Sequence, residues 1–242
     1  PSFHLVPCDG GPLPSYRAGQ YTTVRAFVPE LGVMQLRQYT LSIAPGAMHF
    51  RISVKREPAS TTTPAGRVSN RLHDFYKVGD MLELAPPFGE FFLDETHDGP
   101  VVLISGGVGI TPMMAMIDRL VAAAPSRPVQ FVHACRNAEV FAFGAHLAKV
   151  AERNAQVKLH LFHDEGPVAA PVQSGRVDLR ALAGEVLAPA KLWCDTSTTA
   201  ECAQIMDAVG GAAQTIALAG NPILAGYTAS KLPWTKTHRP EA

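Results

Sequence analysis

The chain has 242 residues, of which 47% are hydrophobic and 17% charged, a composition typical of one large globular domain or two small ones. Basic and acidic residues balance at 21 each, so charge favours neither nucleic acid nor an anionic membrane surface as a partner. Four scattered cysteines without a CxxC pair argue against a disulfide framework or a zinc site. No signal peptide or membrane-length apolar run is found, and we expect a cytoplasmic protein.

The first 97 residues show short β-strand patterns separated by proline and glycine. The candidate strands are 3–6, 20–28, 38–43, 49–55 and 80–85. Their length and spacing predict an antiparallel barrel or a sandwich. Because the first strand is already under way at Phe3, we expect the chain to be a fragment that lacks its N-terminal part. One helix is predicted over 69–76, with Ser69 as N-cap and with Leu72, Phe75 and Tyr76 on its buried face.

The segment Arg37-Gln38-Tyr39-Thr40 is the first with chemical interest. On a strand, Arg37 and Tyr39 share one face while Gln38 and Thr40 share the other. A guanidinium beside a phenol ring suits a ligand that has both a phosphate and a flat ring system. A surface arginine next to a barrel tyrosine leaves the same pattern, and these four residues alone favour that plainer explanation.

A second glycine-led segment, Gly66-Arg67-Val68-Ser69-Asn70, precedes the predicted helix. Its backbone N–H groups could hold an anion at the helix start. The alternative is a capped helix that follows a flexible loop.

The stretch Val101–Met114 reads as strand, glycine turn and helix. An apolar run ends at Ser105-Gly106-Gly107, and the next segment has apolar residues at helical spacing. Thr111 fits the N-cap and Pro112 the first helical position. Bare glycine backbone before a helix N-terminus predicts a pyrophosphate-binding turn in preference to a purely structural one. The P-loop signature is excluded, because no Gly-Lys-Ser/Thr follows.

From Gly99 onward, strands and helices alternate, which predicts a parallel sheet with helices on both faces. The expected strands are 101–104, 129–134, 157–162 and 191–194, the expected helices 112–124, 141–153 and 179–183, and 164–175 is expected to be a loop. Ligands of such sheets lie at the carboxyl ends of the strands, where Gly107, Arg136 and Cys194 fall. Arg136 could hold a ribose 2′-phosphate or be a solvated loop residue.

Taken together, these motifs resemble the ferredoxin-NADP reductase superfamily, and within it the reductase region of flavohaemoproteins (nitric oxide dioxygenases). Arg37-Gln38-Tyr39-Thr40 matches the family's Arg-x-Tyr-Ser/Thr flavin motif, and Gly19-Gln20-Tyr21 matches the Pro-Gly-Gln-Tyr before it, with Ala18 in place of proline. Further matches are 54–57, 66–70, 89–92 and the nicotinamide motif GGVGITPM at 106–113. The resemblance covers residues 1 to about 194.

The resemblance implies a flavin-binding antiparallel β-barrel over 1–97 and a Rossmann-like, parallel-sheet NAD(P)-binding domain over 98–220, atypical from about 195, with an irregular tail over 221–242. It implies that FAD is held by Tyr21, Arg37, Gln38, Tyr39, Thr40, Lys55, Gly66, Val68 and Ser69. It implies that NAD(P)H is held by Gly107, Val108, Gly109, Ile110, Thr111 and Pro112, and the position of Arg136 after the second parallel strand makes it a further candidate. Tyr39, Thr40 and Thr111 would lie at the reacting rings.

The implied activity is an FAD-dependent NAD(P)H oxidoreductase that takes a hydride and passes electrons to haem. The globin domain that carries haem in the family is missing from this chain, so nitric oxide dioxygenation cannot be assigned to it alone. The family's Cys-Gly-Pro and Glu-x-Phe-Gly segments are absent after Cys194, and we expect a diverged, disordered tail in which Tyr227 or Trp234 is the remaining candidate cover for the flavin. Two alternatives stay open: a flavin-binding module with an impaired nucleotide site, and a stand-alone reductase for a ferredoxin or oxygenase.

Overall fold

The computed structural model describes residues 1–61, 64–177, 202, 204, 207–208 and 211. Within this range, Pro1–Ser174 form one compact unit. None of the helices in the described ranges has both the length and the apolar character needed to cross a membrane. The expected helix at 179–183, the strand at 191–194 and the flavin-covering tail lie outside the described residues.

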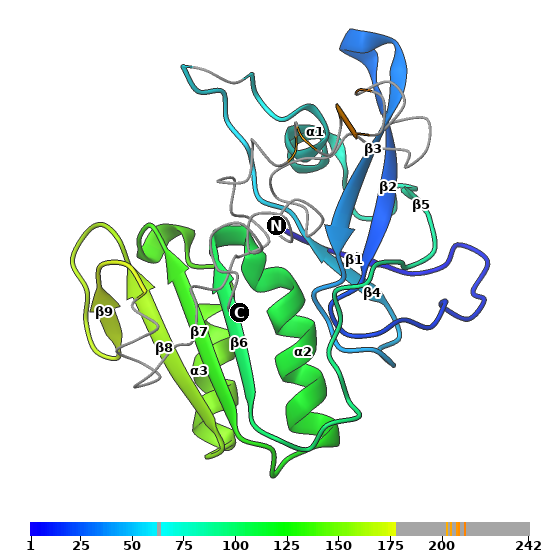
Figure 1. Cartoon of the computed structure of the whole chain (residues 1–242). Coiled ribbons are helices and arrows are strands. Elements are labelled where there is room, and N and C mark those ends of the chain that lie inside the picture. Colours follow the sequence, from blue (N-terminus) through cyan, green and yellow to red (C-terminus); the bar gives the residue numbers. More distant parts are fainter. Residues whose placement is uncertain (62–63, 178–201, 203, 205–206, 209–210, 212–242) are drawn as a thin grey trace. The chain divides into compact units, whose positions relative to one another are not determined.

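The first part of the unit consists of two small antiparallel sheets and one helix (Figure 1). Its elements are β1 (Ser2–Leu5), β2 (Tyr21–Val28), the 3-10 turn η1 (Pro29–Leu31), β3 (Val33–Thr40), β4 (Phe50–Ser53), α1 (Arg67–Phe75) and β5 (Glu83–Leu84). The strands are ordered β3-β2-β5 in one sheet and β1-β4 in the other. A bridge between Leu41 and Ile52 joins the two sheets, and the buried Val24, Ile52 and Leu72 belong to one shared core.

Three expectations for this part need correction. The strand predicted at 38–43 overlaps only the end of β3, which begins at Val33 and stops at Thr40, because β2 pairs with β3 from Tyr21 to Val28. The strand predicted at 80–85 shortens to β5, which pairs with β2 only at Val24 and Arg25. Phe75 is 61% exposed and not on the buried face of α1, whereas the predicted Leu72 is buried and Tyr76 packs against the same core.

The second part is a parallel sheet in the order β6-β7-β8-β9, whose strands lie side by side in Figure 1. Its elements are β6 (Val101–Gly106), the 3-10 turn η2 (Gly107–Gly109), α2 (Ile110–Ala123), β7 (Val129–Cys135), η3 (Ala138–Val140), α3 (Gly144–Arg153), β8 (Val157–His163) and β9 (Val172–Ser174). The predicted fold class, antiparallel strands followed by a parallel sheet, is therefore confirmed. The predicted loop over 164–175 contains β9, which pairs with β8 from Leu161 to His163.

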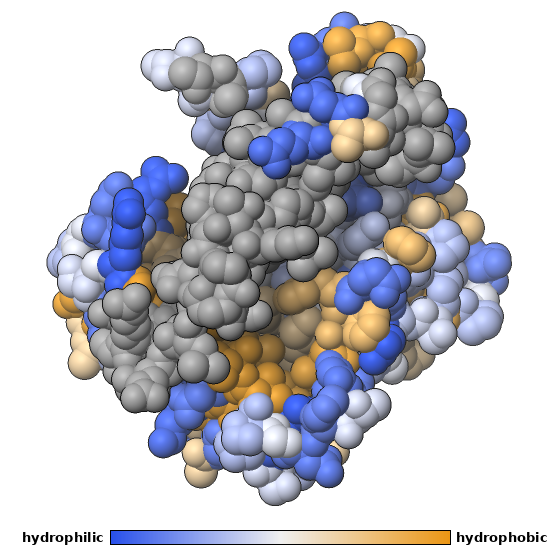
Figure 2. All heavy atoms as spheres, in the orientation of Figure 1, coloured by the Kyte–Doolittle hydropathy of each residue, from blue (hydrophilic) through white to orange (hydrophobic). Residues whose placement is uncertain are grey.

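Helices α2 and α3 pack into one core with Leu103, Phe131 and other side chains of one sheet face. No helix in the described ranges up to residue 177 is placed on the opposite face, so the second of the two predicted helical layers is not found there. On β6, Val102 is 56% exposed, and Figure 2 shows apolar surface over β6 and α2.

The antiparallel part contributes directly to the core of the parallel part. Ala18 and Leu93 are buried in the same cluster as Met116 of α2, and the Leu93 amide donates to the Ala18 carbonyl at 2.8 Å. A Cβ on Gly19, whose φ is +111°, would lie 2.5 Å from Met116 Cε and 2.6 Å from the Phe91 carbonyl oxygen. Glycine is therefore required where the two parts meet.

Candidate functional site

A cavity of about 470 Å³ opens at the carboxyl ends of β6 and β7, a size typical of small-molecule sites. It is lined from the β6–α2 turn by Gly107, Val108, Ile110 and Thr111, from β7 and the following segment by Cys135, Arg136, Val140, Ala142 and Phe143, and from the antiparallel part by Pro1, Ser2, Ser53, Val54 and Lys55. Carboxyl ends of parallel strands are where ligands of such sheets bind.

The β6–α2 turn brings bare backbone to this cavity. Gly107 has a φ of +51°, and a Cβ placed on it would meet nothing within 4 Å. The positive φ favours glycine, and the missing side chain lets a ligand approach the turn closely. The first N–H groups of α2 follow directly, so the cavity wall carries partial positive charge that suits an anion.

The start of α2 differs from the expected cap. Thr111 is the second residue of α2 and not its N-cap, and its hydroxyl donates to the Val108 carbonyl at 3.1 Å. The 3-10 turn η2 runs straight into the α-helix, because the Ile110 N–H already bonds to the Gly107 and Val108 carbonyls. Pro112 is consequently third in the helix and not first. It is tolerated there, because N–H groups of the first turn have no helical acceptor.

Two basic side chains lie among the residues that line the cavity. Arg136 is exposed just after β7, and Lys55 Nζ forms an ion pair with Glu57 at 2.9 Å, both side chains being about half exposed. Their charges favour an anionic ligand. Cys135, which was not predicted to line the site, donates from Sγ to the Asn137 carbonyl at 3.4 Å, and burial raises the pKa of its thiol. This cysteine is therefore a wall residue and not a reactive thiolate.

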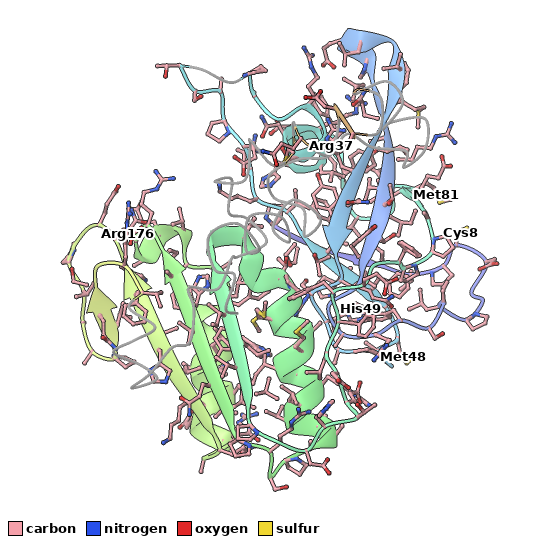
Figure 3. All side chains as sticks on the ribbon, viewed as in Figure 1. Cys8, Arg37, Met48, His49, Met81 and Arg176 are labelled. Atoms are coloured by element: carbon pink, nitrogen blue, oxygen red, sulfur yellow. The ribbon has the colours of Figure 1, made fainter. Side chains whose placement is uncertain are left out.

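A second group of predicted site residues lies on β2 and β3. Register places Tyr39 opposite Thr22 and Thr40 opposite Tyr21. Arg37 is exposed, and Figure 3 shows it on the side of β3 towards α1. Its Nη1 donates to the Leu36 carbonyl at 2.7 Å, and no carboxylate of the described residues forms an ion pair with it. Its remaining donors are available to a phosphate.

Tyr39 is half-buried against the core of the antiparallel part. Burial raises the pKa of Tyr39 to about 12, while the Arg37 charge opposes that shift. Its phenol therefore stays protonated near neutral pH and can donate a hydrogen bond. The Tyr21 ring makes an edge contact with the Phe88 ring, with 6.3 Å between the ring centroids. It also packs closely on Gly89, where a Cβ would lie 2.8 Å from the Tyr21 ring.

The start of α1 is anchored to the segment after β4. Gly66, not Ser69, is its N-cap, and the Ser69 hydroxyl donates back to the Gly66 carbonyl at 3.4 Å. The Gly66 amide donates to the Glu57 carbonyl at 2.9 Å, and the Asn70 side chain bonds to both the amide and the carbonyl of Glu57. Val68 is buried. The first turn is thus rigidly placed, with backbone N–H groups that lack helical acceptors.

The cavity brings together six of the predicted residues: Lys55, Gly107, Val108, Ile110, Thr111 and Arg136. It is not lined by the predicted Tyr21, Arg37, Gln38, Tyr39, Thr40, Gly66, Val68, Ser69, Gly109 and Pro112. Sequence reasoning missed Ser2, Ser53 and Phe143, which carry no motif of their own and reach the cavity only through folding. Phe143 has a φ of +64°, a strained backbone conformation that no pattern in the sequence predicts.

Comparison with known proteins gives consistent results. Residues 103–199 match the family model described as an oxidoreductase NAD-binding domain. The chain is 47% identical over 193 residues to a flavohemoprotein of Chromobacterium violaceum and 47% identical over 196 residues to one of Bordetella pertussis. In both cases the match covers 78% of this chain and 48% of the relative. The chain therefore spans about half the length of the curated relatives it matches.

Solved structures show the same likeness. The FAD/NAD-binding domain of nitric oxide dioxygenase from Vibrio cholerae superposes with a TM-score of 0.69 at 36% identity, covering 77% of this chain and 75% of that one. Phthalate dioxygenase reductase, a modular protein for electron transfer from pyridine nucleotides to a [2Fe-2S] centre, superposes with a TM-score of 0.59 at 31% identity, covering 76% and 52%.

Proposed function

Because the chain belongs to the family of flavohaemoprotein FAD/NAD-binding reductase domains, within the ferredoxin-NADP reductase superfamily, we propose that it is an NAD(P)H-dependent flavin oxidoreductase. Residues 1–97 form the FAD module and residues 98–220 the nucleotide module in this proposal. The observation that carries it is the glycine turn, which presents bare backbone and a helix N-terminus to a cavity of the size typical of small-molecule sites.

The antiparallel part has the donors that FAD requires. The Arg37 guanidinium would bind the phosphates, together with the backbone N–H groups of Val68 and Ser69 in the first turn after Gly66. Tyr39 would pack against the flat ring, and Thr40, its neighbour on β3, would donate a hydrogen bond to it. Tyr21 lies opposite Thr40 and would line the same site, with Gln38 and Lys55 as further contacts.

The cavity has the features that NAD(P)H requires. Gly107, Val108 and Gly109 form the turn that receives the pyrophosphate, and Ile110 to Pro112 open the helix behind it. Arg136 supplies a positive charge for the adenosine end, and Thr111 would lie at the nicotinamide. Cys135 and Phe143 contribute apolar surface to the cavity wall, against which the rings of the nucleotide would pack.

When bound, FAD supplies the ring system that accepts a hydride from NAD(P)H and releases electrons one at a time. The chain needs no general base for this step. Its residues would position the two rings for the transfer, and positioning of this kind contributes most of what the protein adds to such a reaction. The half-buried Tyr39 and the wall around Thr111 are the groups that would fix the ring orientation.

We further propose that the electron acceptor is a haem, as the name of the flavohemoprotein relatives indicates. The part of the chain that the structure describes contains no globin domain, so this acceptor would lie in another domain or protein. A second candidate is an iron–sulfur protein, which is favoured by the likeness to phthalate dioxygenase reductase. A flavin-binding module with an impaired nucleotide site is the third.

The test is to express the full chain, measure FAD binding, and follow oxidation of NADH and NADPH with an artificial acceptor. We expect a yellow protein that oxidises at least one nucleotide. FAD binding without reduction by either nucleotide would select the impaired module, and absence of FAD uptake would refute the proposal. Haem and iron–sulfur proteins, supplied separately, then identify the acceptor.

Arg37→Ala tests the flavin site separately. We expect FAD binding to weaken by about 1.5–3 kcal/mol, the contribution of a hydrogen bond to a charged group. Equilibrium dialysis against FAD measures the change. Arg25→Ala is the matched control, because Arg25 lies on the neighbouring strand and pairs with Glu83 at 2.8 Å at the surface. Equal FAD affinity in both variants would remove Arg37 from the site.

A further inference from the structure

One side chain that does not line the cavity interacts with residues of both parts of the chain that do. Arg51 lies on β4, two residues before Ser53, which lines the cavity from the antiparallel part. Its guanidinium carbon lies 5.2 Å from the centroid of the Phe143 ring, which lines the cavity from the parallel-sheet part. This distance lies within the range of cation–π contacts.

In the antiparallel part, a chain of hydroxyl groups leads from Arg51 to the cavity. Arg51 Nε donates to Ser42 Oγ at 3.2 Å, and its Nη2 donates to the Ser42 carbonyl. Ser42 Oγ is 2.9 Å from Ser53 Oγ, which is 2.8 Å from Ser2 Oγ. Both Ser53 and Ser2 line the cavity, so Arg51 is hydrogen-bonded through Ser42 to one wall.

On the sheet side, Arg51 contacts a residue whose backbone is under strain. Phe143 is the non-glycine residue with positive φ among the described residues, and such a conformation persists only where its surroundings hold it. A Cβ on Gly144, which follows, would lie 2.9 Å from the Phe141 ring, so the chain has little freedom there.

Neighbouring groups stabilise the positive charge of Arg51. Burial lowers its pKa, and the Asp118 carboxylate on α2 and the Tyr16 phenol oppose that shift, with His4 as the other titratable group that interacts with it. Asp118 itself bonds to His146 Nε2 of α3 at 2.6 Å. Arg51 is thus the cation at the point where β4, α2 and the segment before α3 converge.

We propose that Arg51 is a positioning residue that sets the width of the nucleotide cavity, by holding Phe143 on one wall and the Ser42–Ser53–Ser2 chain on the other. This inference rests on the proposed function of the cavity. Arg51 itself does not line the cavity. It determines how closely Phe143 and the turn at Gly107 enclose the nucleotide.

The experiment compares Arg51→Met with Arg25→Met in the full chain, each loaded with FAD. We expect Arg51→Met to bind NAD⁺ or NADP⁺ about tenfold more weakly by calorimetry, the factor that corresponds to a partly desolvated cation–π contact. FAD affinity and kcat should change less than twofold, whereas KM for the nucleotide should rise. Arg51→Lys keeps the charge but lacks the planar fork, and we expect it to recover part of the affinity.

A double-mutant cycle with Phe143→Leu makes the test specific. If Arg51 acts through Phe143, the double variant should bind the nucleotide with the same affinity as whichever single variant has the lower affinity. Additive losses, or equal affinity of Arg51→Met and Arg25→Met, would overturn the inference.

Hydrogen exchange of residues 141–146 in the nucleotide-free protein separates this idea from the proposed function. We expect faster exchange in Arg51→Met than in Arg25→Met. A wild-type chain that binds neither nucleotide would refute the proposed function, while the exchange rates would still decide whether Arg51 holds Phe143. Unchanged exchange of residues 141–146 in Arg51→Met would refute the proposal that Arg51 holds Phe143.

Discussion

His133 on β7 shows how a single buried side chain makes stability depend on pH. Its Nδ1 is 2.9 Å from Ser105 Oγ, its ring stacks on Phe141 at 5.2 Å, and its Nε2 has no partner among the described residues. Burial lowers the pKa of His133 to about 4, and the nearby His163 adds to the shift, while the Ser105 hydrogen bond opposes it.

An unfolded histidine takes up a proton near pH 6.5, whereas folded His133 remains neutral until about pH 4. Between these values the unfolded state binds more protons, so the free energy of unfolding must fall as pH decreases. We expect His133 to account for a loss of about 2 kcal/mol between pH 7 and pH 5. Urea unfolding of the wild type and His133→Gln at both pH values measures this loss of stability. His97→Gln is the control, because the His97 side chain is 76% exposed. The same pH slope in wild type and His133→Gln would contradict the prediction.

The β6–α2 turn is the element on which nucleotide binding depends. Gly107→Val adds a side chain that points into open space beside the cavity and forces a β-branched residue to a φ of +51°. We expect nucleotide affinity to fall on the order of tenfold or more, through loss of close backbone approach to a charged group, with FAD affinity unchanged.

Gly79→Val is the matched control for the turn. Gly79 has a φ of +98° and also meets nothing within 4 Å, but it lies on an exposed turn and does not line the cavity. Both variants should lose stability through backbone strain, and only Gly107→Val should lose NAD⁺ or NADP⁺ binding in calorimetry. Equal nucleotide affinity in the two would remove the turn from the site, and simultaneous loss of FAD would contradict the division into two modules.

At the scale of the whole unit, the two parts share a core instead of merely touching. Leu93 and Ala18 from the antiparallel part are buried in the cluster that contains Met116 and Phe131 of the parallel part. We therefore expect residues 1–174 to unfold in one transition. Leu93→Ala should lower stability by about 2–5 kcal/mol, the usual cost of such a cavity.

Thermal unfolding followed by flavin fluorescence and by circular dichroism tests this expectation. Leu93→Ala should shift both midpoints together, whereas Leu31→Ala, at a 45% exposed position in η1, should shift neither by much. Separate midpoints in the wild type, or a shift of only one midpoint in Leu93→Ala, would show two independently stable modules.

The sequence alone was sufficient for the fold class, the glycine turn and the family, because each depends on local pattern. Alternation at Phe50 and Ile52 predicted a strand, and the apolar run before Gly106 predicted the first parallel strand, both of which the structure confirms. Residues near in sequence determine such features through side-chain periodicity and backbone freedom.

Only the tertiary structure decided the end of each element and the far walls of the cavity. Thr111 is not the predicted N-cap, because the preceding 3-10 turn continues into α2. Ser69 is not the N-cap of α1 either, because that position is taken by Gly66, whose amide bonds to Glu57. Ser53 and Phe143, 90 residues apart in sequence, meet at one cavity through Arg51. Contacts of this range depend on how β4 and the segment before α3 pack together, and no local periodicity encodes that packing.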